Sequence, residues 1–142
     1  MPPVGAALWR SLRAHQVYGA NTDVGKTIVS TVLCNAIQRL NSQSPAAFLK
    51  PVSTGPLDDA DDRHIRRYAP GTLTKCLYQF DEPVSPHIAA KQKQLTIPRD
   101  DDIITSVHQT LSDWAAKGID FALVETAGGV HSPGPNGNSQ AD

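Results

Sequence analysis

Apolar side chains recur at helical spacing in two stretches of the chain. Between residues 26 and 40 they return every three or four positions, which predicts an amphipathic helix, and the polar residues from Asn41 onward end it. A second helix is predicted from the three aspartates at 100–102, which suit its positive end, to Gly118, which suits its stop. Residues 61–68 predict a third, shorter helix.

Three short apolar runs predict strands between these helices. Residues 119–124 (IDFALV) predict a strand that is buried on both faces. Residues 46–49 (AAFL) predict another strand, residues 16–18 a short first one, and residues 77–80 a further short extended piece. Because strands and helices alternate, we expect a parallel α/β sheet with flanking helices and right-handed crossovers.

The predicted sheet is incomplete at its C-terminal end. A parallel sheet of only three strands has an exposed edge and uncovered apolar faces, which complete domains avoid. Residues 139–142 (SQAD) have the form of a helix capping box, and its helix would follow. We therefore interpret residues 1–14 as an irregular lead-in and residues 15–142 as the N-terminal part of a larger domain.

Composition excludes several classes of protein. A formal net charge of -1 gives no electrostatic footprint for nucleic acid. The apolar runs are far shorter than the roughly 18 residues of a membrane-spanning helix, so we expect no membrane partner. Cys34 and Cys76 are the only cysteines and have no paired spacing, which indicates a reducing compartment.

The N-terminal residues leave two locations open. The first 22 residues contain Arg10, Arg13 and His15 and no acid, a composition that faintly resembles a mitochondrial transit peptide. An irregular lead-in to the first strand explains the same residues. The expectation is therefore the mitochondrial matrix, with the cytoplasm as the alternative.

Residues 19–27 (GANTDVGKT) join the first predicted strand to the first predicted helix. The stretch matches a phosphate-binding loop, except that five residues lie between Gly19 and Gly25, one more than the usual pattern allows. In this context the backbone N–H groups face a phosphate, Lys26 reaches the phosphates and the Thr27 hydroxyl holds Mg²⁺. The alternative is that Lys26 is a solvated helix-start residue. The loop predicts an α/β fold of the P-loop NTPase type.

Three further groups of polar residues are predicted at the same edge of the sheet. Glu125 follows the 119–124 strand and precedes a glycine-rich loop, so it can share a metal ion with the loop, although a solvated strand-end acid is the alternative. Lys50 ends the 46–49 strand, and with Thr54 it could neutralise a transferring phosphoryl group or hold an anionic acceptor. Lys50 could equally be a plain exposed lysine. The acidic cluster at 58–62 could supply one more oxygen ligand.

Five stretches together resemble dethiobiotin synthetase, in particular the synthetase part of the eukaryotic fused enzymes that also carry a diaminopelargonate aminotransferase. These stretches are residues 19–27, 50–55, 82–87, 124–129 and 132–137. The resemblance implies an ATP- and Mg²⁺-dependent reaction that combines 7,8-diaminopelargonate with CO₂ and closes the ring of dethiobiotin in biotin biosynthesis. It also implies a homodimer for the full-length enzyme.

The resemblance further implies a role for each matching residue. The implied catalytic residues are Lys26, Lys50 and Asp23. The implied nucleotide-binding residues are Thr22, Val24, Gly25, Lys26 and Thr27. The implied substrate-binding residues are Thr54, Ser85, Pro86, Gly128 and Gly129. The implied metal ligands are Thr27, Asp61 and Glu125, and Asp61 is preferred over Asp62 because Ile65 then falls at the apolar position four residues on.

Two other functions remain open. One is another member of the same deviant P-loop group, such as a partitioning ATPase or a cobyrinate-type amidotransferase, although residues 20–21 lack the early lysine of partitioning ATPases. The other is a non-catalytic remnant that only binds nucleotide. We also expect the 142-residue chain alone to have little or no synthetase activity.

Overall fold

The protein folds around a parallel sheet, as the sequence predicts. The computed structural model describes residues 11–21, 24–80, 98–134 and 136–139. The four strands are β1 (Arg13–Val17), β2 (Ala46–Thr54), β3 (Leu73–Phe80) and β4 (Phe121–Glu125). They lie in the order β1-β4-β2-β3, and every neighbouring pair is parallel. The predicted α/β class is confirmed.

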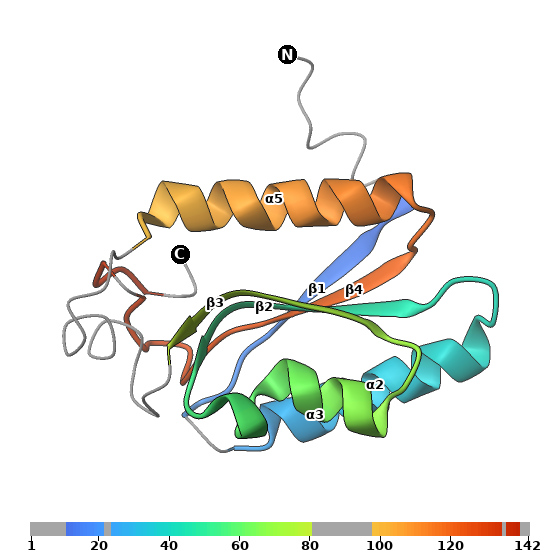
Figure 1. Ribbon diagram of the computed structural model, residues 1–142, viewed down its shortest axis with the longest axis horizontal. Coiled ribbons are helices and arrows are strands. Elements are labelled where there is room, and N and C mark those ends of the chain that lie inside the picture. The colour runs from blue at the N-terminus through green and yellow to red at the C-terminus, as the bar shows by residue number, and fades with distance from the viewer. Residues whose placement is uncertain (1–10, 22–23, 81–97, 135, 140–142) are drawn as a thin grey trace, which may run out of the picture.

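Helices cover both faces of the sheet (Figure 1). Helices α2 (Lys26–Leu40) and α3 (Asp61–Tyr68) lie side by side on one face, and α5 (Asp100–Ala116) lies on the other. A short 3₁₀ turn, η1 (Leu57–Asp59), precedes α3. All three predicted helices are confirmed. Among the described residues, no helix has both the length and the apolar character needed to cross a bilayer.

The apolar run at the start of β2 is unbroken because both faces of this strand are buried. Successive side chains of a strand point to opposite faces, and both faces of this sheet are covered. Leu49 packs with Trp114 of α5, whereas Phe48 packs with Cys34 and Ile65 beneath α2 and α3. Fully burying a side chain of this kind contributes about 1.5–3 kcal/mol, so β2 anchors both layers.

The structure corrects the predicted number of strands. The sequence predicts three strands and a short extended piece at 77–80, but β3 is a full strand from Leu73 to Phe80 that pairs with β2 along its length. The described part of β3 pairs only with β2, so this strand lies at the edge of the sheet. An edge strand tolerates polar residues such as Thr74 and Lys75. Strand β3 therefore lacks the continuous apolar run from which the other strands were predicted.

Two strand boundaries also differ from prediction. Strand β2 continues through Pro51 to Thr54, where the sequence predicts a loop. The ladder between β2 and β4 ends at Leu49 and Val124, before Pro51, so the proline stands in a part of β2 that pairs only with β3. Strand β1 begins at Arg13, ahead of the predicted 16–18. Within the described residues it pairs only with β4, and its exposed polar residues do not form an apolar run.

Candidate active site

The carboxyl ends of β1, β2 and β4 meet the N-terminal ends of α2 and α3 at one edge of the sheet (Figure 1). A cavity of about 480 Å³ lies at this edge. Its lining includes Lys26, Thr27, Lys50, Thr54, Asp61 and Glu125. Open parallel sheets bind ligands at this edge, so the cavity is the candidate site.

The loop after β1 places the start of α2 in the cavity. Gly25 adopts the left-handed conformation, with φ of 96°, directly before α2. Among the described residues, no side chain caps the helix, and Gly25, Lys26 and Thr27 line the cavity. A helix start of this kind attracts an anion through its backbone N–H groups and its dipole. Val24 is half exposed, and the ammonium of Lys26 donates to the carbonyl of Asn21 at 3.2 Å.

Gly128 and Gly129 have different surroundings. Gly128 lines the cavity. Gly129 is buried, and a Cβ at this position would lie 2.7 Å from the carbonyl oxygen of Ala20. The next residue, Val130, donates its N–H to the carbonyl of Gly19 at 2.8 Å. Gly129 therefore allows the loop after β4 to pack against the phosphate-binding loop.

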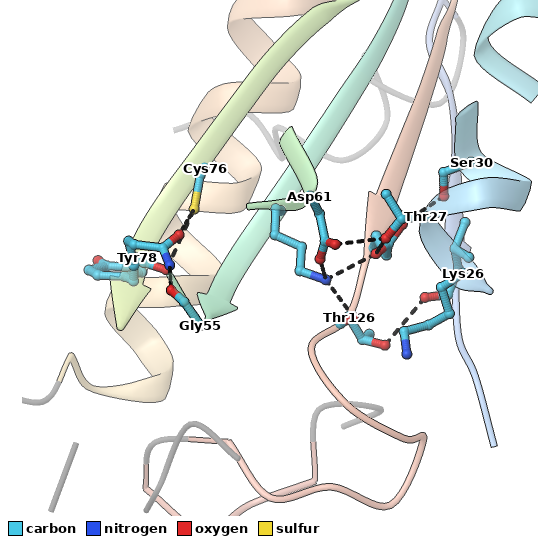
Figure 2. A network of polar contacts seen from close by, with 12 residues as sticks. Lys26, Thr27, Ser30, Gly55, Asp61, Cys76, Tyr78 and Thr126 are labelled. Carbon is cyan, nitrogen blue, oxygen red and sulfur yellow. Dashed lines mark hydrogen bonds and ion pairs between the residues drawn. The ribbon is translucent and has the colours of Figure 1, made fainter. Parts of the chain in front are cut away.

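Oxygen atoms from three elements converge beside the loop (Figure 2). The Thr27 hydroxyl lies 2.8 Å from Asp61 Oδ1 and 3.0 Å from Glu125 Oε1, so its hydrogen is shared between two carboxylates. The Lys50 ammonium lies 2.5 Å from Asp61 Oδ2 and 3.0 Å from Glu125 Oε1. Thr27 starts α2, Asp61 starts α3 and Glu125 ends β4. The sheet edge thus brings together residues that are far apart in sequence.

The ionic contacts keep the buried Lys50 and the partly exposed Asp61 charged. Burial lowers the pKa of Lys50, but the charges of Glu125 and Asp61 raise it by more, so the pKa lies above its ordinary value. Burial raises the pKa of Asp61, but the charge and hydrogen bond of Lys50 outweigh it, so this pKa lies below its ordinary value. The Lys50 ammonium and the Asp61 carboxylate are therefore both ionised at neutral pH.

The geometry separates Asp61 from Asp62. Consecutive helix residues point about 100° apart, because a turn takes about 3.6 residues. Asp61 faces Thr27 and Lys50, whereas the carboxylate of Asp62 pairs with Arg66 one turn later in α3. Only Asp61 joins the oxygen cluster.

Sequence reasoning missed Ser30. Its hydroxyl is buried and donates to Glu125 Oε2 at 2.7 Å. Figure 2 shows Ser30 on the same helix as Thr27. The signal was available, because residues three apart on a helix share a face, and Ser30 is a polar residue three positions after Thr27.

The remaining predicted site residues are either at the cavity or outside the described residues. Thr54 lines the cavity at the end of β2. Four predicted site residues lie outside the described residues: Thr22, Asp23, Ser85 and Pro86.

The donor set of the cluster fits Mg²⁺. In the described ranges, no group of three or more His, Cys, Asp or Glu side chains could hold a metal ion. Asp61, Glu125 and Thr27 instead offer two carboxylates and a hydroxyl, all hard oxygen donors. Mg²⁺ is usually held by one or two carboxylates together with water or substrate phosphates, so this donor set suits Mg²⁺.

A parallel sheet whose first strand leads through a Gly-Lys-Thr loop into a helix, with an acid at the end of the neighbouring strand, defines a P-loop nucleotide-binding domain. The sequence profile of one such family, described as an AAA domain, matches residues 13–142. The chain belongs to this family.

The chain is also similar to dethiobiotin synthetases over most or all of its length. It is 81% identical over 142 residues to the bifunctional dethiobiotin synthetase/adenosylmethionine-8-amino-7-oxononanoate aminotransferase of Emericella nidulans, covering 100% of this chain and 18% of the relative. The mitochondrial bifunctional enzyme of Oryza sativa is 30% identical, covering 91% of this chain and 22% of the relative. The ATP-dependent dethiobiotin synthetase of Geobacillus kaustophilus is 32% identical, covering 81% of this chain and 47% of the relative.

These similarities confirm the resemblance that the five sequence stretches indicate. The chain spans only 18% to 47% of the lengths of these three relatives.

Proposed function

We propose that this chain carries the nucleotide and metal site of a dethiobiotin synthetase. The observation that supports the proposal most is the convergence of Thr27, Lys50, Asp61 and Glu125 on one cavity beside the phosphate-binding loop. The 81% identity to a protein named as a dethiobiotin synthetase supports the choice among P-loop enzymes.

The start of α2 would hold the phosphates of ATP. Gly25 turns the chain into α2, whose first residues line the cavity, and Lys26 adds a positive charge to the same lining. The role predicted for Thr22 and Asp23, which is to place the loop beside the acceptor, remains a prediction.

Thr27, Asp61 and Glu125 would hold Mg²⁺, which neutralises phosphate charge during phosphoryl transfer. Ser30 fixes the far oxygen of Glu125, so the near oxygen keeps its orientation toward Thr27. Holding oxygen donors in place before the ligand arrives reduces the reorganisation that binding requires.

The reaction that the family resemblance implies has three steps. One amine of 7,8-diaminopelargonate adds to CO₂ and loses a proton to give a carbamate. A carbamate oxygen attacks the γ-phosphorus of ATP, the bond to ADP breaks, and a carbamic-phosphoric anhydride forms. The second amine attacks the carbonyl carbon, and inorganic phosphate and a proton leave as the ring closes. Lys50 would steady the negative charge of the carbamate and γ-phosphoryl group, and Thr54 would contact the substrate side.

Location and assembly are part of the same proposal. The names of the rice and Arabidopsis relatives include the word mitochondrial, which supports the mitochondrial matrix over the cytoplasm for the longer protein. A homodimer is expected for that longer protein.

A chimera tests the proposed function. In the Emericella nidulans relative, this chain would replace the segment to which it is 81% identical. We expect the chimera to form dethiobiotin from ATP, CO₂ and 7,8-diaminopelargonate, and we expect Lys26→Ala to reduce the rate by at least about 100-fold, since Lys26 contributes charge to the transition state. The control Lys117→Ala, beyond the end of α5, should retain the rate.

A chimera that keeps its aminotransferase activity but forms no dethiobiotin would contradict the proposal. Nucleotide binding without synthesis would favour the non-catalytic alternative.

A further inference from the structure

The Lys50 side chain uses all of its hydrogen-bond donors within the protein. An ammonium group has three N–H donors. Lys50 Nζ lies 3.0 Å from Glu125 Oε1, 3.0 Å from the carbonyl oxygen of Thr126 and 2.5 Å from Asp61 Oδ2. The lysine is 3% exposed. In this position it has no donor left for a phosphate or a carbamate.

Lys50 also uses the oxygens that a metal ion would need. Glu125 Oε1 contacts both Lys50 and the Thr27 hydroxyl, and Asp61 contacts the same two residues. A magnesium ion requires ligand oxygens at about 2.0–2.1 Å in near-octahedral geometry. A divalent cation among these oxygens would stand within a few ångströms of the ammonium, where two positive charges repel strongly because the site is buried.

We propose that Lys50 acts as a counter-cation to Asp61 and Glu125, and that metal binding at these carboxylates releases its ammonium into the nucleotide cavity. This inference rests on the proposed function, because it takes Thr27, Asp61 and Glu125 as the metal ligands. It also resolves a conflict, since the role proposed for Lys50 requires N–H donors that its contacts with Glu125, Thr126 and Asp61 already use.

Burial explains why a counter-cation is present at all. Glu125 is 0% exposed, and a buried carboxylate without a positive partner is unfavourable. The Lys50 ammonium neutralises this charge and keeps Asp61 and Glu125 oriented toward Thr27. Lys50 and Thr54 line the same cavity, so a released ammonium stays beside the space for the transferring group. Metal binding would then make Lys50 available for the phosphoryl-transfer step, in which it steadies the charge of the carbamate and the γ-phosphoryl group.

Calorimetric titration of the 142-residue chain with Mg²⁺ alone tests the exchange. Lys50→Met removes the competing ammonium, so we expect this variant to bind Mg²⁺ at least about fivefold more tightly than the unmodified chain, a typical coupling between linked sites. Lys117→Met removes the same charge far from the site, and screening should leave its Mg²⁺ affinity unchanged. Equal or weaker binding by Lys50→Met would overturn the exchange and leave the metal site intact.

A second measurement uses the unmodified chain and does not depend on the folding of a variant. A buried, hydrogen-bonded ammonium exchanges its protons slowly enough for its ¹H–¹⁵N signal to be followed. We expect the Lys50 signal to shift or disappear in proportion to Mg²⁺ saturation. A signal that stays unchanged at saturation would overturn the exchange. If neither the unmodified chain nor Lys50→Met binds Mg²⁺, the metal site of the proposed function fails, and this inference fails with it.

Discussion

At the scale of single residues, Glu125 shows how the site holds a buried charge. One carboxylate oxygen contacts Thr27 and Lys50, and the other accepts a hydrogen bond from Ser30. Each oxygen of this fully buried group has at least one partner, as buried charges require. The orientation of Glu125 therefore depends on three side chains from two different elements, α2 and β2.

Replacing Ser30 tests this dependence. Ser30→Ala removes a hydrogen bond to a buried charged group, so we expect it to lower the free energy of unfolding by about 1.5–3 kcal/mol. Ser42→Ala is the matched control, because Ser42 is exposed in the turn after α2. Urea unfolding monitored by circular dichroism measures both variants. If Ser30→Ala is as stable as Ser42→Ala, the hydrogen bond to Glu125 is not a stabilising contact.

The thiol of Cys34 gives a second prediction. Burial raises the pKa of this fully buried group to about 11, although Thr72 partly opposes the effect. The thiolate is the reactive form, and near pH 8 a pKa of 11 leaves only about a thousandth of the thiol ionised. We expect Cys34 to resist a thiol reagent in the folded protein and to react after unfolding in urea. Rapid, stoichiometric labelling of native Cys34, located by mass spectrometry, would contradict this placement.

The sequence predicted the positions of these residues in the fold better than their contacts. The positions of Lys26, Lys50 and Glu125 follow from their places at strand and helix ends. That Lys50 spans two carboxylates does not follow, because side-chain pairing depends on the distance between α3 and β2 in space. Ser30 was missed although its position three residues after Thr27 on the same helix gave a signal.

At the scale of elements, the helices were easier to predict than the strands. The sequences of α2 and α5 show apolar residues that recur at helical spacing, which is a strong local signal. Strand β3 alternates only weakly because it lies at an edge. The extension of β2 past Pro51 depends on where its ladder with β4 ends, and that is set by packing between strands.

The contact between the loops after β1 and β4 gives a prediction at this scale. In Gly129→Ala the new Cβ would lie 2.7 Å from Ala20 O and 3.1 Å from Asn21 Cα, both backbone atoms that cannot rotate away. We expect a loss of about 1–3 kcal/mol in the free energy of unfolding, which is typical of overpacking. Thermal denaturation would measure it.

Gly134→Ala is the control for this prediction, because its nearest atom would be Asn138 O at 3.3 Å. Equal stability of the two variants would show that the two loops move apart without penalty.

At the scale of the whole molecule, the sheet brings residues from α2, α3, β2 and β4 to one edge. The family and the α/β class were predictable because loop, strand and helix occur in a fixed order along the chain. The number and order of strands were not, because they depend on long-range pairing such as β1 with β4. The described part of α2 exposes apolar side chains, among them Val32 at 61%, which a short pattern cannot distinguish from core positions.

The length of the relatives gives a prediction at the same scale. The chain covers 18% of the Emericella nidulans relative and 47% of the Geobacillus kaustophilus enzyme. Because the chain matches only part of the length of each relative, we expect the 142-residue chain alone to form little or no dethiobiotin. A product assay alongside the chimera measures this, and comparable rates for the two proteins would contradict it.

The proposed function depends on the oxygen cluster of Thr27, Asp61 and Glu125 being a metal site. Neighbouring residues of α3 offer a matched pair of variants, because Asp61 faces Thr27 whereas Asp62 pairs with Arg66. The most direct measurement is the Mg²⁺ affinity of Asp61→Asn and Asp62→Asn by calorimetry. The account predicts that Asp61→Asn weakens Mg²⁺ binding by at least about tenfold, as loss of a carboxylate ligand should, and that Asp62→Asn does not. Equal effects, or a larger effect of Asp62→Asn, would contradict it.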